Sequence, residues 1–220
     1  MYTHNKASQD SITPNQAIEF LKEGNKRFVS NLKMNRNLLQ QVNATKDGQH
    51  PFAVILSCID SRTSAELIFD QGLGDIFSIR IAGNIVNEDI LGSMEFACKI
   101  AGAKAIIVLG HTGCGAVKGA CDHAEMGHLT GLVNKIKPAV AKIEQNVPNA
   151  NGNKVDLVAT ENVHLMVKEI INRSSIIHTM LEENKIGIIG GMYNVETGVV
   201  NFFDELNYSE AKELSVAKAE

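Results

Sequence analysis

The sequence predicts an α/β domain with a mostly parallel sheet. Short apolar runs, typical of buried strands, alternate along the 220 residues with longer stretches that carry one apolar stripe, as helices do. A composition of 44% hydrophobic and 21% charged residues is that of an ordinary globular protein. Because no linker, repeat or low-complexity tract interrupts the alternation, we expect a single domain over residues 1–220.

The first predicted helix begins after Thr13. The hydroxyl of this residue can cap the helix, Pro14 suits the first helical position, and Gln16 stands where a capping box needs it. The helix continues over residues 17–31, and its single apolar stripe indicates that it packs against another part of the protein. Polar residues 43–51 then predict a loop.

Strands and helices are expected to alternate after that loop. The last two strands are joined by a turn and are predicted to form a hairpin at a sheet edge. The predicted strands cover residues 52–56, 76–82, 104–109, 185–195 and 199–203. The predicted helices cover residues 65–71, 87–102, 112–121, 128–145 and 155–174.

Charge and hydropathy exclude several classes of protein. A net charge of −4 and a pI near 6.0 argue against binding to nucleic acid or to an anionic membrane surface. No apolar run approaches the roughly 20 residues of a membrane span, and the first residues lack the apolar region of a secretory signal. We therefore expect a cytoplasmic protein whose partners are small molecules or copies of itself. In such a compartment the four cysteines are expected to be buried hydrophobes, metal ligands or nucleophiles.

Two of the apolar strands end directly in reactive residues, in the segments CIDSR (58–62) and HTGC (111–114). The carboxyl ends of parallel strands meet at one edge of a sheet, where ligands usually bind. Residues two apart in an extended chain point the same way, so Cys58 and Asp60 can face one point. His111 and Cys114 are three apart and converge if a helix begins near residue 110. Two thiolates and one imidazole form a ligand set typical of catalytic zinc.

Asp60 has two alternative roles in that hypothesis. It can be the fourth metal ligand, which closes the site, or it can pair with Arg62 and leave the fourth position to water. A thiol nucleophile in a phosphatase-type loop is disfavoured, because five residues separate cysteine and arginine there and three do here.

Other candidate residues are expected to have structural roles. Cys98 and Cys121 lack metal-binding neighbours and are predicted to be core residues. The glycines at 113, 115 and 119 fit no nucleotide-binding spacing. Solvated or hydrogen-bonded roles are expected for the remaining histidines, which are His4, His50, His123, His128, His164 and His178.

The two segments together resemble the signature of the β-class carbonic anhydrases. The resemblance extends more loosely from Gln49 through IFSIRIAGN to Lys118, and to GMYNVETG near the end of the chain. It implies a parallel four-stranded core sheet with an added edge strand, wrapped by helices. It also implies that residues 1–48 form an N-terminal helical arm whose helix packs across a dimer partner, and that the protein forms a dimer or tetramer.

The resemblance also implies roles for individual residues. Cys58, His111 and Cys114 would bind one zinc ion per chain, and Asp60 and Arg62 would free or fill its fourth coordination position. Residues implied to bind substrate are Gln49, Gly115, Phe77 and Phe96, with the neighbouring subunit supplying part of the pocket. Arg80 matches an arginine of a bicarbonate-regulated branch, but Ile55 replaces the tryptophan of that branch. We therefore predict a structural ion pair for Arg80.

The implied reaction is the reversible hydration of carbon dioxide to bicarbonate and a proton, through attack of zinc-bound hydroxide, by a lyase that needs no other cofactor. Two alternatives stay open from the sequence. A carbon disulfide or carbonyl sulfide hydrolase could use the same scaffold, and a non-catalytic zinc module would keep Asp60 permanently on the metal.

Overall fold

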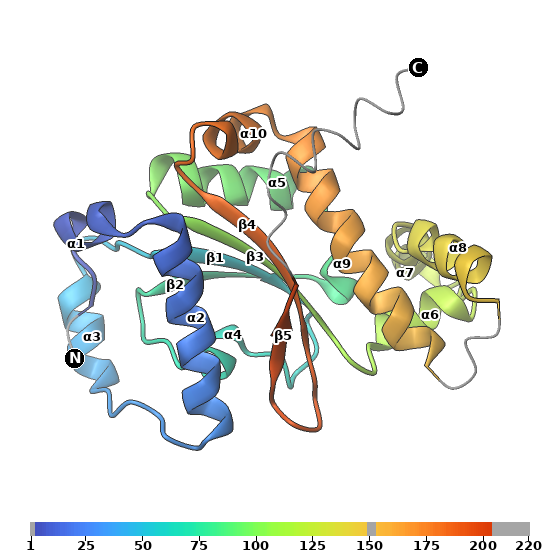
Figure 1. Cartoon of the computed structure of the whole chain (residues 1–220), viewed down its shortest axis with the longest axis horizontal. Coiled ribbons are helices and arrows are strands. Elements are labelled where there is room, and N and C mark those ends of the chain that lie inside the picture. The colour runs from blue at the N-terminus through green and yellow to red at the C-terminus, as the bar shows by residue number, and fades with distance from the viewer. Residues whose placement is uncertain (1–2, 149–152, 204–220) are drawn as a thin grey trace.

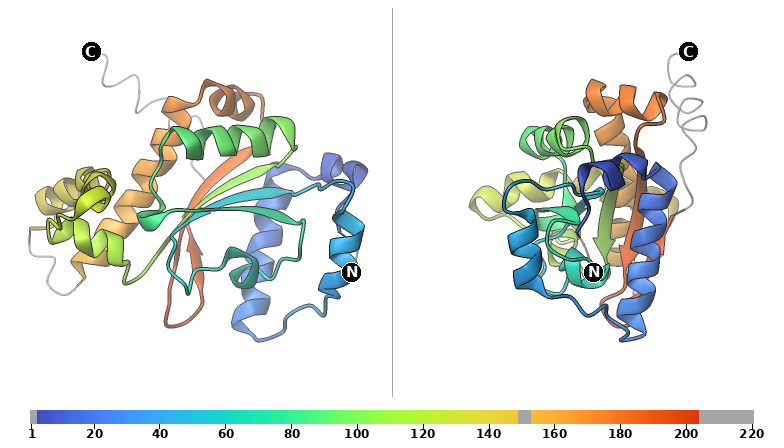
Figure 2. Two further views of the ribbon diagram at one scale, coloured as in Figure 1. Left: turned by 180° about the vertical axis from the view of Figure 1, so that it is seen from behind. Right: turned by 90° about the vertical axis from the view of Figure 1, so that its left-hand side faces the viewer.

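The computed structural model describes residues 3–148 and 153–203. The other residues of the predicted domain, 1–2, 149–152 and 204–220, lie outside the described residues. A five-stranded sheet in the order β2-β1-β3-β4-β5 has helices on both faces (Figures 1 and 2). The strands are β1 (Ala53–Ser57), β2 (Ile76–Arg80), β3 (Ala105–His111), β4 (Gly187–Tyr193) and β5 (Val200–Phe202). The first four are parallel and β5 is antiparallel to β4, which confirms the predicted sheet.

The helices occupy most of the chain between the strands. They are α1 (Lys6–Ser11), α2 (Pro14–Val29), α3 (Leu38–Thr45), α4 (Ala65–Ile68), α5 (Glu88–Glu95), α6 (Gly115–Cys121), α7 (Gly127–Asn134), α8 (Lys137–Asn146), α9 (Lys154–Arg173) and α10 (Ser175–Glu182). A short 3₁₀ turn, η1 (Ala82–Asn84), follows β2, and a π-helical turn, η2 (Phe96–Ile100), continues α5. None of these helices is both long and apolar enough to cross a membrane.

The central strands are buried on both faces because alternate side chains supply two separate cores. Ile55 and Ile107 point to the face that α2 and α4 cover. Leu56 and Val108 point to the opposite face, where they pack with residues of α5, α6, α8, α9 and α10. Leu56 pairs with Val108 across the sheet, so β1 and β3 end side by side. This register places the residues that follow the two strands at one edge.

Helix α2 packs on the sheet of its own chain. The predicted capping box at Thr13 is present, and the apolar residues Ala17, Ile18 and Leu21 are buried in the core of the chain itself. The expectation that this apolar stripe packs against another part of the protein is therefore confirmed, with the neighbouring sheet face as its partner. A contact of the other face of α2 with a partner stays a prediction.

Local patterns missed some helix boundaries. Helix α3 lies partly in the segment predicted as a loop, and it keeps Leu38, Leu39 and Val42 exposed. The single helix predicted over residues 128–145 is two helices, α7 and α8. Pro138 lies in the first turn of α8, where the missing N–H of proline costs nothing.

Candidate metal centre

Three potential metal ligands meet at the carboxyl ends of β1 and β3. Cys58 directly follows β1, His111 is the last residue of β3, and Cys114 is the N-cap of α6. One ligand atom from each of these residues lies within 4.8 Å of the other two, and all three residues are buried. We call these three residues the metal centre. The sheet register explains why they meet, because β1 and β3 are parallel neighbours.

The turn between His111 and Cys114 differs from the prediction. The spacing predicted that both residues lie on one face of a starting helix. In the structure His111 still belongs to the strand, and helix α6 begins only after Cys114. Gly113 joins them with a φ of +62°, in the left-handed region that glycine adopts readily. The convergence therefore comes from a tight strand-to-helix turn.

The donor atoms of the metal centre fit a zinc ion. The two sulfur atoms are 4.0 Å apart, and two sulfurs bound tetrahedrally to one zinc are about 3.8 Å apart. The Nδ1 atom of His111 lies 2.9 Å from the carbonyl oxygen of Thr112, which can only accept a hydrogen bond, so Nδ1 carries the proton and donates. The Nε2 atom therefore keeps its lone pair, and it is buried with no hydrogen-bond partner in the described residues. A buried nitrogen without a partner is costly unless it binds something.

The surroundings of Cys58 favour the thiolate, the form that binds metal. The sulfurs of Cys58 and Cys114 form a hydrogen bond, which lowers the pKa of Cys58 although burial opposes the shift. The backbone N–H of Gly83 also donates to the Cys58 sulfur, at 3.4 Å. The pKa of Cys114 is raised by the same hydrogen bond and by burial. A divalent cation would favour the thiolate of both residues.

Asp60 pairs with Arg62 and is not part of the metal centre. Nε of Arg62 lies 2.9 Å from Oδ1 of Asp60, and Nη2 lies 2.8 Å from Oδ2. The backbone N–H of Arg62 donates to Oδ1 as well, at 2.9 Å. These hydrogen bonds hold the pKa of Asp60 well below its usual range. Of the two alternatives that the sequence left open, the structure has the one in which Asp60 is turned toward Arg62.

Arg80 supports the loop between β1 and Asp60. Its guanidinium donates to the carbonyl oxygen of Cys58 at 3.1 Å and to that of Asp60 at 2.6 Å. The predicted structural role is therefore supported by hydrogen bonds to uncharged carbonyl oxygens among the described residues. The predicted ion pair of Arg80 stays a prediction.

The residues that the resemblance assigns to substrate lie at different distances from the metal centre. Gly115 follows Cys114 directly and is exposed. Phe77 and Phe96 contact each other, with ring centroids 6.4 Å apart, beside a surface hollow between β2 and α5. Gln49 is exposed in a hollow beside the end of α3, before the first residue of β1. The single chain therefore brings Gly115 next to the centre and leaves Gln49 at the opposite end of β1.

The two remaining cysteines lie apart from the metal centre, whereas Gly83 contacts it. Burial raises the pKa of Cys98 to about 12, and neither Cys98 nor Cys121 belongs to the metal centre. Gly83, which the sequence analysis did not single out, contacts the Cys58 sulfur through its N–H. The sequence signal that could have found it is the glycine in the segment IAGN, directly after a predicted strand. In the structure this glycine has a φ of +68°, which suits a tight turn.

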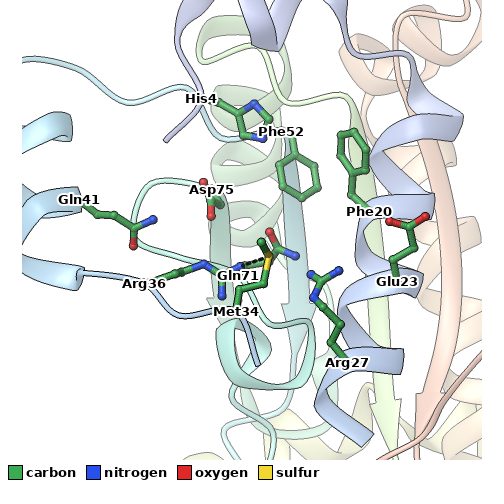
Figure 3. Close-up of a pocket in the computed structure, with 10 residues that line it drawn as sticks. All are labelled: His4, Phe20, Glu23, Arg27, Met34, Arg36, Gln41, Phe52, Gln71 and Asp75. Carbon is green, nitrogen blue, oxygen red and sulfur yellow. Dashed lines mark hydrogen bonds between the residues drawn. The ribbon is translucent and has the colours of Figure 1, made fainter. Parts of the chain in front are cut away.

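An enclosed pocket lies away from the metal centre. It has a volume of about 280 Å³ and lies between α2 and the segments around α3 and the amino end of β1 (Figure 3). Its walls include Phe20, Phe52 and Arg36, and none of the three metal-centre residues lines it. The chemistry described above therefore belongs to the carboxyl edge of the sheet, away from this pocket.

Comparison with known proteins identifies relatives. A family model described as carbonic anhydrase matches residues 53–200. Carbonic anhydrase 2 of Mycobacterium tuberculosis is 36% identical over 195 residues, which cover 86% of this chain and 92% of the relative. Carbonic anhydrase of Mycolicibacterium smegmatis is 34% identical over 200 residues, which cover 88% and 95%. The solved structure of the β-carbonic anhydrase CcaA has a TM-score of 0.70 at 27% identity, over 86% of this chain and 94% of that one. All three residues of the metal centre fall within the matched segment.

Proposed function

The chain belongs to the β-class carbonic anhydrase family, and from this premise we propose how its metal centre carries out the reversible hydration of carbon dioxide. The observation that carries the proposal is the buried group of two sulfurs and one unpartnered imidazole nitrogen. Three protein ligands with one free position are typical of catalytic zinc, and a fourth protein ligand would be typical of a structural site.

Cys58, His111 and Cys114 would hold one zinc ion per chain. When bound, zinc lowers the pKa of a water molecule to near 7 and so supplies a nucleophile at neutral pH. Asp60 has no part in holding the ion while Arg62 takes both of its oxygens. The pairing with Arg62 therefore favours catalysis over a purely structural centre.

Asp60 and Gly115 are placed to orient the reacting groups. The carboxylate of Asp60 is ionised, because Arg62 lowers its pKa, and each of its oxygens can accept more than one hydrogen bond. It would accept a hydrogen bond from the attacking water and fix the direction of the reactive lone pair. Gly115 is the first residue of α6, so its N–H has no partner within the helix and would donate to an oxygen of bicarbonate.

Gln49 could act only on the site of another copy of the chain. It precedes β1, whereas Cys58 follows it, and five residues of strand separate the two ends by about 16 Å. If Gln49 orients substrate, two chains must associate so that Gln49, before β1 of one chain, lies near the metal centre of the other chain. The exposed ring of Phe96 packs against the half-buried Phe77 of the open edge strand β2, and this apolar surface supports such an association.

We also propose that the protein works in the cytoplasm. Its four cysteines are free thiols, which are typical of a reducing compartment.

The test combines metal analysis with stopped-flow measurement of carbon dioxide hydration. We expect one zinc per chain and hydration activity in the unaltered protein. Cys58→Ala, His111→Ala and Cys114→Ala should each lose zinc and activity, because three ligands are the minimum for a catalytic zinc. Cys98→Ala is the matched control and should keep both. Full zinc and full activity in Cys114→Ala would show that the assignment is wrong.

A parallel assay with carbon disulfide and carbonyl sulfide tests the substrate. Faster turnover of either sulfur compound than of carbon dioxide would favour a hydrolase on this scaffold. One zinc per chain without turnover of any of the three substrates would favour a structural zinc module.

A further inference from the structure

Helix α9 lies directly against the strand that carries His111 (Figure 1). The contact is made at Gly110, the residue before His111. A Cβ atom added there would lie 2.6 Å from Cγ2 of Val163 and 3.6 Å from the carbonyl oxygen of Ala159. Only a glycine lets the helix approach the strand this closely, so α9 contacts the backbone next to one metal ligand.

The first turn of α9 also holds the turn between His111 and Cys114. Oδ1 of Asp156 accepts a hydrogen bond from the backbone N–H of Gly113 at 2.8 Å. Gly113 has a left-handed backbone, and an added Cβ there would meet no atom within 4 Å. The residue before it, Thr112, is held by β4, because its N–H donates to the carbonyl oxygen of Tyr193 at 3.0 Å. The hydrogen bond from Asp156 holds Gly113 itself, on the side of the turn that faces α9.

Asn162 on the same helix holds the turn that faces Cys58. This side chain is buried, and its Nδ2 donates to the carbonyl oxygen of Gly83 at 2.9 Å. The N–H of Gly83 in turn donates to the sulfur of Cys58. A buried carbonyl that loses a hydrogen-bond donor carries a free-energy cost, so removal of the Asn162 side chain would allow η1 and the Gly83 N–H to shift.

We infer that Asp156 and Asn162 are positioning residues that hold the two cysteines of the metal centre at the separation one tetrahedral ion needs. Neither residue touches a ligand atom, and each acts through one glycine. This inference rests on the proposed metal site. In proteins whose metal ligands are known, loss of such outer hydrogen bonds lowers metal affinity by about tenfold to a hundredfold. If Asp156 and Asn162 had a purely structural role, their substitution would lower the free energy of unfolding and leave the metal affinity unchanged.

The test measures metal binding, independently of activity. Zinc affinity is measured by competition with a chromophoric chelator, and the absorption spectrum of the cobalt-substituted protein reports the geometry of the thiolate ligands. We expect Asp156→Ala and Asn162→Ala to weaken zinc binding by about tenfold or more and to alter the cobalt spectrum. Asp156→Asn should restore both, because its amide oxygen can accept the same hydrogen bond.

The control is Glu169→Ala, which removes a carboxylate that pairs with Arg173 near the far end of α9 and should change neither measurement. Asp156 is at the surface end of the helix, so its variants stay informative even if Asn162→Ala does not fold. Zinc affinity and a cobalt spectrum in Asp156→Ala that equal those of the unaltered protein would overturn the inference. Failure of the unaltered protein to bind zinc would instead overturn the proposed metal site.

Discussion

Arg62 is the residue that we propose keeps Asp60 away from the metal centre. Its guanidinium makes two parallel hydrogen bonds to the carboxylate of Asp60, a geometry that lysine cannot reproduce. Because Asp60 lies two residues from Cys58, we expect a carboxylate released by Arg62 to reach a metal ion bound at the metal centre. Whether the fourth metal position is open to water or closed by Asp60 would therefore depend on the ion pair between Asp60 and Arg62.

Arg62→Ala is expected to keep its zinc and to lose carbon dioxide hydration by about a hundredfold or more. The reason is that Asp60 would then be free to occupy the position that water needs. Metal analysis and stopped-flow hydration of the same sample check this result. Arg173→Ala, which removes a surface arginine paired with Glu88, is the control. Normal hydration by Arg62→Ala would contradict the role given to the pair.

At the scale of elements, the contact between α2 and α4 depends on one glycine. A Cβ atom at Gly24 would lie 1.8 Å from the carbonyl oxygen of Phe69, and a backbone atom cannot move aside as a flexible side chain can. We expect Gly24→Ala to lower the free energy of unfolding by about 1–3 kcal/mol or more. Gly92→Ala is the matched control in α5, where an added Cβ meets nothing within 4 Å. It should raise the free energy of unfolding by up to about 1 kcal/mol. Urea denaturation measures the free energy of unfolding of both variants. Equal values for Gly24→Ala and Gly92→Ala would contradict the role of the contact at Gly24.

Asp70 joins α2 to the segment before α3. Its buried carboxylate accepts hydrogen bonds from Nε of Arg27 and from Nη1 of Arg36, both at 2.6 Å. Burial works to raise the pKa of Asp70, but these hydrogen bonds outweigh it, and the pKa is lowered. A lowered pKa means that the ionised carboxylate stabilises the fold above the ordinary pKa of 3.8. This stabilisation is lost as the pH falls below that value toward the pKa of the folded protein.

Asp70→Asn is expected to lower the free energy of unfolding by about 3–5 kcal/mol near neutral pH, because two arginines lose their carboxylate. Asparagine suits the test since residue 70 has a φ of +45°, which asparagine tolerates. The difference between the two proteins should shrink as the pH falls below about 4, because protonation removes the same charge from Asp70. Denaturation curves of both proteins at several pH values measure this difference in the free energy of unfolding. A difference that stays constant or grows as the pH falls would contradict the stabilising role of the ionised Asp70.

At the scale of the whole molecule, the exposed apolar residues near the open edge of the sheet suggest self-association. Phe96 is 52% exposed and contacts Phe77 of β2, and Ile100, in the same π-helical turn, is 73% exposed. We expect sedimentation equilibrium to show dimers or multiples of dimers, and Phe96→Glu to shift the mass toward the monomer. Met126→Glu, at an exposed residue beside α7, should leave the mass unchanged. A monomer with full hydration activity would contradict both the association and the role of Gln49.

The sequence by itself determined the sheet and the three residues that meet in the metal centre. Continuous apolar runs predict strands buried on both faces, and two of these runs end at Cys58 and at His111. Both signals are local, because strand burial and the residue that follows a strand can be read within about ten positions. The parallel order of the strands then requires the two ends to lie at one edge, which is why the three ligands could be predicted together.

Only the tertiary structure decided how that edge is completed. The pairing of Asp60 with Arg62 was one of two alternatives, because a flexible carboxylate two residues from a ligand can reach either partner. Asp156 is 43 positions from Gly113, and no local pattern links residues at that distance. The same holds for the packing of α2 on its own sheet. Contacts of this kind depend on which surfaces remain uncovered once the strands have paired, and that is a property of the folded chain as a whole.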